Sequence, residues 1–192
     1  MDGEDDPDEG ASSPPTGFLW WLRFVGSVLG RFWLTLVIGG TLIATLPAAL
    51  PGWSAYVVKS GSMEPKIMIG DVVIVQRRSD YTDGQVVTFH NPALEGALTT
   101  HRLVSIHGDS VTTKGDANVS DDPRTSVPSD IVGLGRIKVG WIGLPMIWLQ
   151  QHHWVPFLLF WLSVAGAVAA WRSDPELIPH QPRHARARTA RV

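Results

Sequence analysis

The sequence predicts a mainly β domain flanked by two transmembrane α-helices. Two long apolar segments lie near the ends of the 192-residue chain, and the region between them carries short β-branched runs separated by turn residues. We therefore expect the following regions along the chain. They are an acidic disordered tail (1–16), a membrane-proximal segment with the first transmembrane helix (17–53), the β domain (54–138), an interfacial apolar rim (139–153), the second transmembrane helix (154–171) and a basic cytoplasmic tail (172–192).

The amino-terminal tail predicts disorder, and the overall composition argues against nucleic-acid binding, a disulfide framework and a thiolate metal site. Residues 1–16 (MDGEDDPDEGASSPPT) combine acidic residues with Pro, Ser and Gly and contain almost nothing to bury, which predicts disorder. A net charge of −2 gives no global attraction to nucleic acid, so we expect no nucleic-acid partner. The chain has no cysteine, so neither a disulfide framework nor a thiolate metal site can form.

The first apolar segment is a run of 27 uncharged residues from Phe32 to Val58. A helix needs roughly 20 apolar residues to cross the hydrocarbon core of a bilayer. We therefore place a transmembrane helix from Phe32 to about Leu50. A cleaved secretory signal is the alternative, but this apolar run is long and the acidic head does not resemble a basic signal-peptide start.

The second apolar segment, from Val139 to Trp171, contains no Asp, Glu, Lys or Arg. Its best spanning core is Trp154–Trp171, whereas Gly143 and Pro145 interrupt the part before it, which we interpret as a rim lying on the membrane. Arginines precede the first span and follow the second, at Arg23, Arg31, Arg172 and further along the tail. The positive-inside rule therefore predicts cytoplasmic termini and a β domain on the outer side of a cell membrane.

The middle of the chain carries β-branched runs at 71–75, 85–89, 103–106, 110–113 and 131–137. Turn signals such as Thr82-Asp83-Gly84 and His107-Gly108-Asp109 separate them, and no segment between them has a convincing helical period. We expect a small sandwich- or barrel-like β domain of about 85 residues, in line with several short strands that are separated by turns.

Ser62 is a candidate nucleophile within Ser60-Gly-Ser-Met-Glu-Pro65. A serine beside a glycine can lie on a tight turn with its N–H directed into a cleft, but its hydroxyl needs a base to be reactive. Ser-Gly-Ser alone is also a common linker fragment. The Met-Glu-Pro that follows is unlike a linker, because it adds an apolar residue and a turn.

His101 is the candidate base, since a histidine, with an ordinary pKa of about 6.5, suits proton transfer at neutral pH. An isolated strand histidine is, however, more often a surface residue. The loop at 114–122 (KGDANVSDD) supplies carboxylates that could orient His101, although it also fits a solvated turn or a weak calcium loop. The histidine spacing gives no support to a zinc site, and we expect no metal or cofactor.

In this order and spacing, the motifs resemble type I signal peptidases of the branch found in archaea, some Gram-positive bacteria and the endoplasmic reticulum. The resemblance covers Ser54 to Gly143. It rests on Ser60-Gly-Ser-Met-Glu-Pro65, Gly70-Asp71-Val-Val, Gly84-Gln-Val-Val, His101-Arg102, Lys114-Gly-Asp-Ala-Asn118 and Asp121-Asp122.

The resemblance implies that Ser62 is the nucleophile, His101 the base and Asp122 the carboxylate that orients it. It also implies a supporting role for Asp116 in its loop, and an oxyanion hole formed by the Ser60 hydroxyl and the Ser62 N–H. The bacterial branch with a serine–lysine dyad makes a lysine base the rival. Its candidates are Lys59, Lys66, Lys114 and Lys138, none of which has an obviously apolar setting.

One position departs from the family pattern. The usual motif is Gly-Asp-Asn-Asn, and this chain has Ala117 in place of one of its asparagines. This departure concerns the hydrogen bonding of the loop rather than the triad. The implied activity is removal of signal peptides from exported pre-proteins by a membrane-bound serine endopeptidase. Its expected partners are these pre-proteins, the lipid bilayer and, as a candidate, the secretion translocon. The alternative is a catalytically silent β domain that binds a protein partner.

Overall fold

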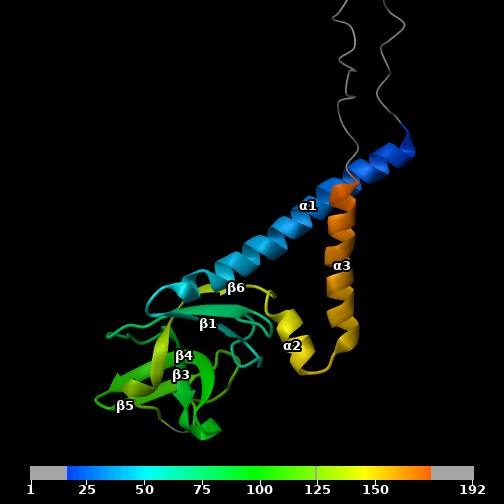
Figure 1. Cartoon of the computed structure of the whole chain (residues 1–192). Coiled ribbons are helices and arrows are strands. Elements are labelled where there is room, and N and C mark those ends of the chain that lie inside the picture. Colours follow the sequence, from blue (N-terminus) through cyan, green and yellow to red (C-terminus); the bar gives the residue numbers. More distant parts are fainter. Residues whose placement is uncertain (1–16, 124, 174–192) are drawn as a thin grey trace, which may run out of the picture. The chain divides into compact units, whose positions relative to one another are not determined.

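The structure is a computed structural model that describes residues 17–123 and 125–173 (Figure 1). The predicted acidic tail and the arginines from Arg183 onward lie outside the described residues. The chain divides into two compact units. One comprises residues 34–164, and the other has its described part at 17–33 and 165–173.

Within the described residues, two helices are long and apolar enough to cross a membrane. They are α1 (Phe18–Thr45) and α3 (Trp154–Arg172). Helix α1 begins ahead of the predicted span and ends before Pro47, because proline lacks the N–H that the next helical hydrogen bond requires. A short 3₁₀ helix, η1 (Pro47–Ala49), follows it, and the candidate membrane span as a whole runs from Phe18 to Ala49.

The smaller unit brings the first part of α1 against the last part of α3. A Cβ atom on Gly30 would lie 2.8 Å from the backbone oxygen of Ala167, and Ser27 is fully buried. Small residues of this kind let two helices approach closely in a membrane.

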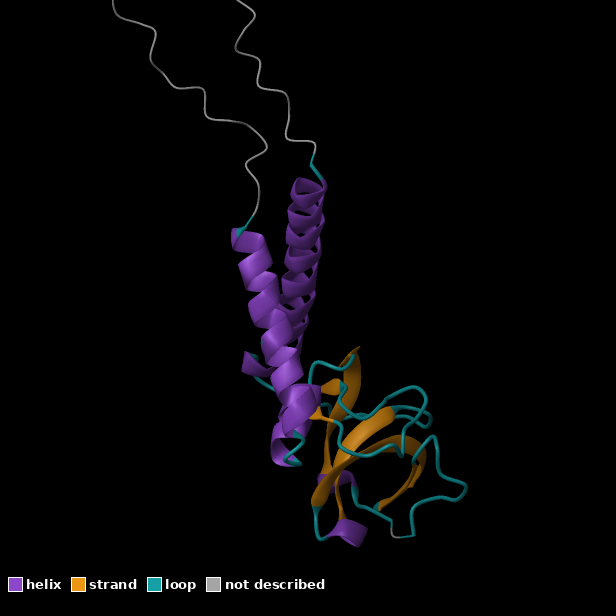
Figure 2. Cartoon of the chain, turned by 90° about the vertical axis from the view of Figure 1, so that its right-hand side faces the viewer, coloured by secondary structure: helices purple, strands orange, loops and turns teal. Residues whose placement is uncertain are grey.

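The larger unit contains one six-stranded antiparallel sheet, which confirms the prediction of a mainly β domain flanked by two helices (Figure 2). The strands are β1 (Trp53–Val57), β2 (Val72–Gln76), β3 (Val86–Asn91), β4 (Ala97–His107), β5 (Ser110–Lys114) and β6 (Ile131–Val139). Their order in the sheet is β1-β2-β6-β3-β4-β5. The last strand in sequence therefore lies between β2 and β3.

The core of the sheet has two hydrophobic clusters. One contains Val87, Phe89, Leu103, Val111 and Ile131, and the other contains Met63, Ile67, Val73 and Val75. Strand β3 contributes to both, because successive side chains of a strand point to opposite faces: Val87 belongs to the first cluster and its neighbour Val86 packs against the second. The fold is thus one sheet with apolar packing on both faces rather than a two-layer sandwich.

Two elements, β1 and α2, were not anticipated, and a third, β4, is longer than predicted. Strand β1 lies at the end of the first apolar segment, where its residues could not be distinguished from a continuation of that segment. Strand β4 begins at Ala97, ahead of the predicted run. The predicted irregular rim contains a short helix, α2 (Leu144–Gln150), which has Pro145 in its first turn, where a missing N–H costs nothing.

Candidate active site

Ser62 lies on the loop between β1 and β2, residues 58–71, called here the Ser62 loop. Two of its apolar side chains, Met63 and Ile67, are buried against Val73 and Val75 of β2. Because the residue directly after Ser62 is a core residue, the serine is held at a fixed height above the sheet. Burial of a methionine side chain is worth about 1.5–3 kcal/mol.

His101 lies in the middle of β4, directly opposite Val87 of β3. It is buried, and its ring lies 6.2 Å from the ring of Phe89. The sequence placed His101 at the edge of a predicted strand, whereas the structure pairs it with Val87 inside the longer strand β4. The imidazole is therefore presented from a rigid element.

Ser62, His101 and Asp122 form a continuous hydrogen-bonded chain. Ser62 Oγ lies 3.0 Å from His101 Nε2, and His101 Nδ1 lies 2.7 Å from Asp122 Oδ2. A carboxylate can only accept, so Nδ1 carries the proton, and Nε2 is left to accept from the serine hydroxyl. Thr113 of β5 also donates its hydroxyl to Asp122 Oδ2, and this fixes the carboxylate in place.

The loop at residues 115–122, called here the Asp122 loop, is tied to the Ser62 loop through backbone contacts. Ala117 donates its N–H to the Ser62 carbonyl over 2.9 Å. A Cβ atom on Gly115 would lie 2.6 Å from that same carbonyl oxygen, so glycine permits the close approach. Since Ala117 acts through its backbone, the absence of the usual asparagine side chain does not remove this contact.

Asp116 faces Arg102 rather than His101. The Arg102 guanidinium donates to both carboxylate oxygens of Asp116, from Nε over 2.8 Å and from Nη2 over 2.6 Å, and Lys66 lies 3.7 Å away. The hydrogen bonds from Arg102 lower the pKa of Asp116 below its ordinary value, and partial burial opposes them. The same pair raises the pKa of Arg102.

Ser60 lies beside the predicted nucleophile. The two hydroxyl oxygens of Ser60 and Ser62 are 3.5 Å apart, and both residues line the same cleft. Because the Ser62 proton is directed to His101, the Ser60 hydroxyl is the donor available at this end of the cleft.

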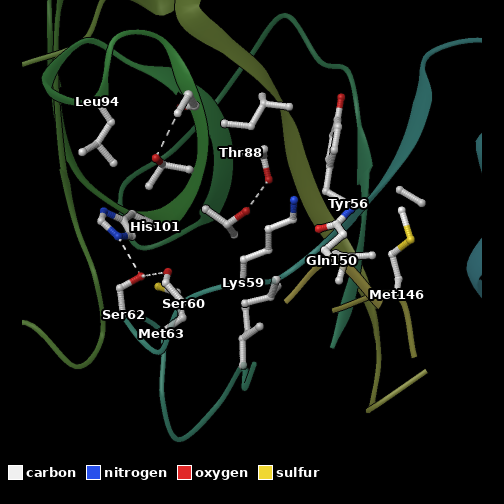
Figure 3. A pocket seen from close by; sticks show the side chains of 18 of the residues that line it. Tyr56, Lys59, Ser60, Ser62, Met63, Thr88, Leu94, His101, Met146 and Gln150 are labelled. Atoms are coloured by element: carbon white, nitrogen blue, oxygen red, sulfur yellow. Dashed lines mark hydrogen bonds between the residues drawn. The ribbon is translucent and has the colours of Figure 1, made fainter. Parts of the chain in front are cut away.

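A cleft with a volume of about 700 Å³ opens at Ser62. One wall is formed by β1 and the Ser62 loop, and another by the hairpin of β3 and β4. Helix α2 contributes Met146 and Gln150. Figure 3 shows Ser60, Ser62 and His101 at one end, and Tyr56, Met146 and Gln150 at the other. The cleft is thus long enough to hold a peptide segment with Ser62 at one end.

The four candidate lysines differ in their surroundings, but none contacts Ser62 Oγ. Lys66 lies near Asp116, and Lys138 pairs with Asp71 over 3.3 Å. Lys114 donates to the Val119 carbonyl over 3.1 Å. Lys59 lines the cleft, and Figure 3 shows its side chain directed away from Ser62.

Sequence reasoning missed several residues of the site. Thr113 binds Asp122 and Arg102 binds Asp116. These two pairs could be found only from the register of the strands. Leu94 and Leu98 also line the cleft without any signal in the sequence, whereas Asn118, another lining residue, belongs to the Lys114–Asn118 motif. Within residues 17–123 and 125–173, the structure holds no cluster of three or more His, Cys, Asp or Glu side chains suited to a metal ion.

Comparison with known proteins agrees with this geometry. The profile of the family described as "Signal peptidase, peptidase S26" matches residues 30–128. The signal peptidase complex catalytic subunit SEC11 of Ajellomyces capsulatus (strain NAm1 / WU24) is 30% identical over 127 residues, which cover 54% of this chain and 68% of that protein.

Two further relatives extend the comparison. The catalytic subunit sec11 of Neurospora crassa is 30% identical over 132 residues, covering 62% of this chain and 75% of that protein. Signal peptidase I W of Bacillus subtilis is 36% identical over 96 residues, covering 46% of this chain and 50% of that protein. The matched segment includes strands β1 to β5 of the sheet and places the chain among the peptidases. The chain belongs to the signal peptidase family, peptidase S26.

Proposed function

We propose that this chain is a membrane-bound serine endopeptidase that removes amino-terminal signal peptides from exported pre-proteins. The observation that carries the proposal is the hydrogen-bonded chain from Ser62 through His101 to Asp122 in the wall of a peptide-sized cleft. In this proposal Ser62 is the nucleophile, His101 the general base and acid, and Asp122 the carboxylate that orients His101.

Acylation begins when Ser62 Oγ attacks the carbonyl carbon of the scissile bond. His101 Nε2 takes the hydroxyl proton as the Oγ–C bond forms, and Asp122 stabilises the resulting imidazolium. The oxyanion is held by the Ser62 backbone N–H and the Ser60 hydroxyl. Loss of one such donor costs on the order of 3 kcal/mol of transition-state stabilisation.

Collapse of the intermediate breaks the C–N bond, and His101 returns its proton to the leaving amine of the mature protein. Water then attacks the acyl-enzyme, with His101 as the base again. The signal peptide leaves with a new carboxylate, and Ser62 regains its proton.

The substrate assignment is supported by the names of the relatives, which describe signal peptidases. Signal peptides carry small residues before the cleavage site, of the Ala-x-Ala type. The two apolar helices support membrane anchoring, which would keep the cleft near the depth at which such sites emerge. Association with the translocon or with other subunits would fit the same location.

The decisive experiment incubates the full chain, purified in neutral detergent, with a pre-protein that carries an Ala-x-Ala site. We expect a mature amino terminus by mass spectrometry and labelling of Ser62 by a serine-directed acylating probe. Ser62→Ala should abolish both. Ser79→Ala, at an exposed loop serine outside the cleft, is the matched control and should behave like the wild type.

A second set of variants separates histidine from lysine as the base. His101→Ala should remove nearly all cleavage, whereas methionine at each of the four lysine positions should leave appreciable cleavage, because none of these ammonium groups contacts Ser62 Oγ. A wild-type chain that neither cleaves nor reacts with the probe would instead favour the silent partner-binding β domain.

A further inference from the structure

Lys59 is the one charged side chain among the lining residues of the cleft apart from the titratable His101. It lies two residues after the end of β1 and is exposed to solvent. The rest of the lining is apolar or carries neutral hydroxyls and amides, and it includes no Asp or Glu. The cleft therefore contains an uncompensated positive charge.

Among the lysines in the described part of the chain, Lys59 differs in that its ammonium group has no ion-pair or hydrogen-bond partner there. Lys66 and Lys138 each have a carboxylate within 4 Å, and Lys114 donates to a carbonyl. No ion pair or hydrogen bond joins the Lys59 ammonium to any residue within 17–123 or 125–173. An ammonium with three donors that faces a peptide-binding cleft is available for a ligand anion.

The position of Lys59 along the cleft indicates which part of a substrate it would meet. Figure 3 shows Lys59 between the Ser62–His101 end and the end formed by Tyr56, Met146 and Gln150. A substrate bound as proposed above has its scissile carbonyl at Ser62. In this proposal the residues before the scissile bond occupy the part of the cleft lined by Lys59 and by α2, the helix that carries Met146 and Gln150.

We propose that Lys59 is a specificity-determining residue that favours substrates with a carboxylate side chain in the few residues before the scissile bond and disfavours Lys or Arg there. This inference rests on the proposed function, because it assumes that the cleft binds a signal peptide. The recognising chemistry is an ammonium–carboxylate pair at a partly exposed site.

The expected size of the effect follows from the exposure of Lys59. Exposed ion pairs contribute up to about 1 kcal/mol, which corresponds to a roughly fivefold ratio of kcat/KM. The pair should also weaken as ionic strength rises, because salt screens charges that are open to solvent. A steric preference would not show this dependence on salt.

The test uses the full chain in neutral detergent and a panel of pre-proteins that differ by one residue, Asp, Asn or Lys, at each of positions −2, −4, −5 and −6. The measured quantity is the ratio of kcat/KM for the Asp substrate to that for the Asn substrate. At one position or more we expect a ratio of about five for the wild type, about one for Lys59→Met and below one for Lys59→Glu. Lys59→Arg should keep the preference.

Arg77→Met provides the matched control, since it removes the same charge from a surface position outside the cleft and should retain the wild-type ratio. A wild-type ratio near one at every position, or an unchanged ratio in Lys59→Met, would overturn the inference. Cleavage of the Asn substrate that is abolished by Ser62→Ala shows that the proposed function holds in either case. If no substrate in the panel is cleaved, the proposed function itself fails.

Discussion

His101 and Arg102 are consecutive residues of β4, so their side chains leave the strand on opposite faces. His101 binds Asp122, while Arg102 binds Asp116, and both carboxylates belong to the Asp122 loop. One loop is thus held at two points by two neighbouring residues of a single strand. The two carboxylates should have separable roles.

Substitution of each carboxylate by its amide tests this separation. Asp122→Asn should cut kcat severely and leave the thermal unfolding temperature nearly unchanged, because the amide can favour the wrong histidine tautomer. The same kind of change costs about 10⁴ in rate in a well-studied serine protease. Asp116→Asn should lower both stability and kcat, since it weakens charged hydrogen bonds worth about 1.5–3 kcal/mol each.

The Asp116 effect should depend on pH. Arg102 stabilises the charged carboxylate and lowers its pKa in the folded protein. This contribution is complete above the ordinary aspartate pKa and is lost as pH falls through the lower folded pKa. The stability difference between wild type and Asp116→Asn, measured by thermal unfolding in detergent, should therefore be full at neutral pH and shrink in acid. Equal differences at both pH values would contradict this assignment.

The role of a single residue could be predicted from the sequence where the residue belongs to a short motif. It could not be predicted where it depends on a contact with a residue that is distant in the sequence. Ser62, His101 and Asp122 could be proposed from their motifs and order. The pairing of Arg102 with Asp116 could not, because it depends on the register between β4 and β5, which includes a shift between Leu103 and Ser105. For Lys59 the sequence indicated only that its setting is not obviously apolar, and its place in the cleft follows from the path of the chain after β1.

Among the elements, the Ser62 loop offers a direct test of how burial positions a reactive side chain. Met63 is 1% exposed and Met68, in the same loop, is 53% exposed. Met63→Ala should destabilise the protein by about 2–5 kcal/mol, because it leaves a cavity under the loop. Met68→Ala is the matched control and should change stability by no more than about 0.5 kcal/mol.

The measurement is thermal unfolding together with kcat for a pre-protein. Met63→Ala should also lower kcat, since the loop that carries Ser62 loses its anchor. Similar effects from the two methionine substitutions would show that burial of Met63 does not position Ser62.

The elements themselves could be predicted where β-branched runs were bounded by turns, as for β2, β3, β5 and β6. Strand β1 was hidden because it continues an apolar segment, and the start of β4 because Ala97–Thr100 lack the strict apolar/polar alternation of a half-buried strand. Helix α2 was missed since seven residues are too few to establish a period.

For the whole molecule, the arginines at Arg23, Arg31 and Arg172 predict a hairpin with both termini in the cytoplasm. A reporter that is active only outside the cytoplasm should be active when inserted at Glu95, an exposed turn position, and silent at either terminus. A minimal-linker insertion at Glu95 that retains cleavage would control for folding. Reporter activity at the carboxyl terminus would contradict the two-span arrangement.

The place of β6 in the sheet has a consequence for the order of events during synthesis. The Ser62 loop belongs to β1 and β2, whereas His101 and Asp122 belong to β4 and the loop after β5, and β6 lies between these halves as the last strand to be made. A nascent chain therefore carries all three side chains before it has the strand that joins them. The sheet that brings Ser62 beside His101 and Asp122 therefore cannot be complete until residues 131–139 have been made.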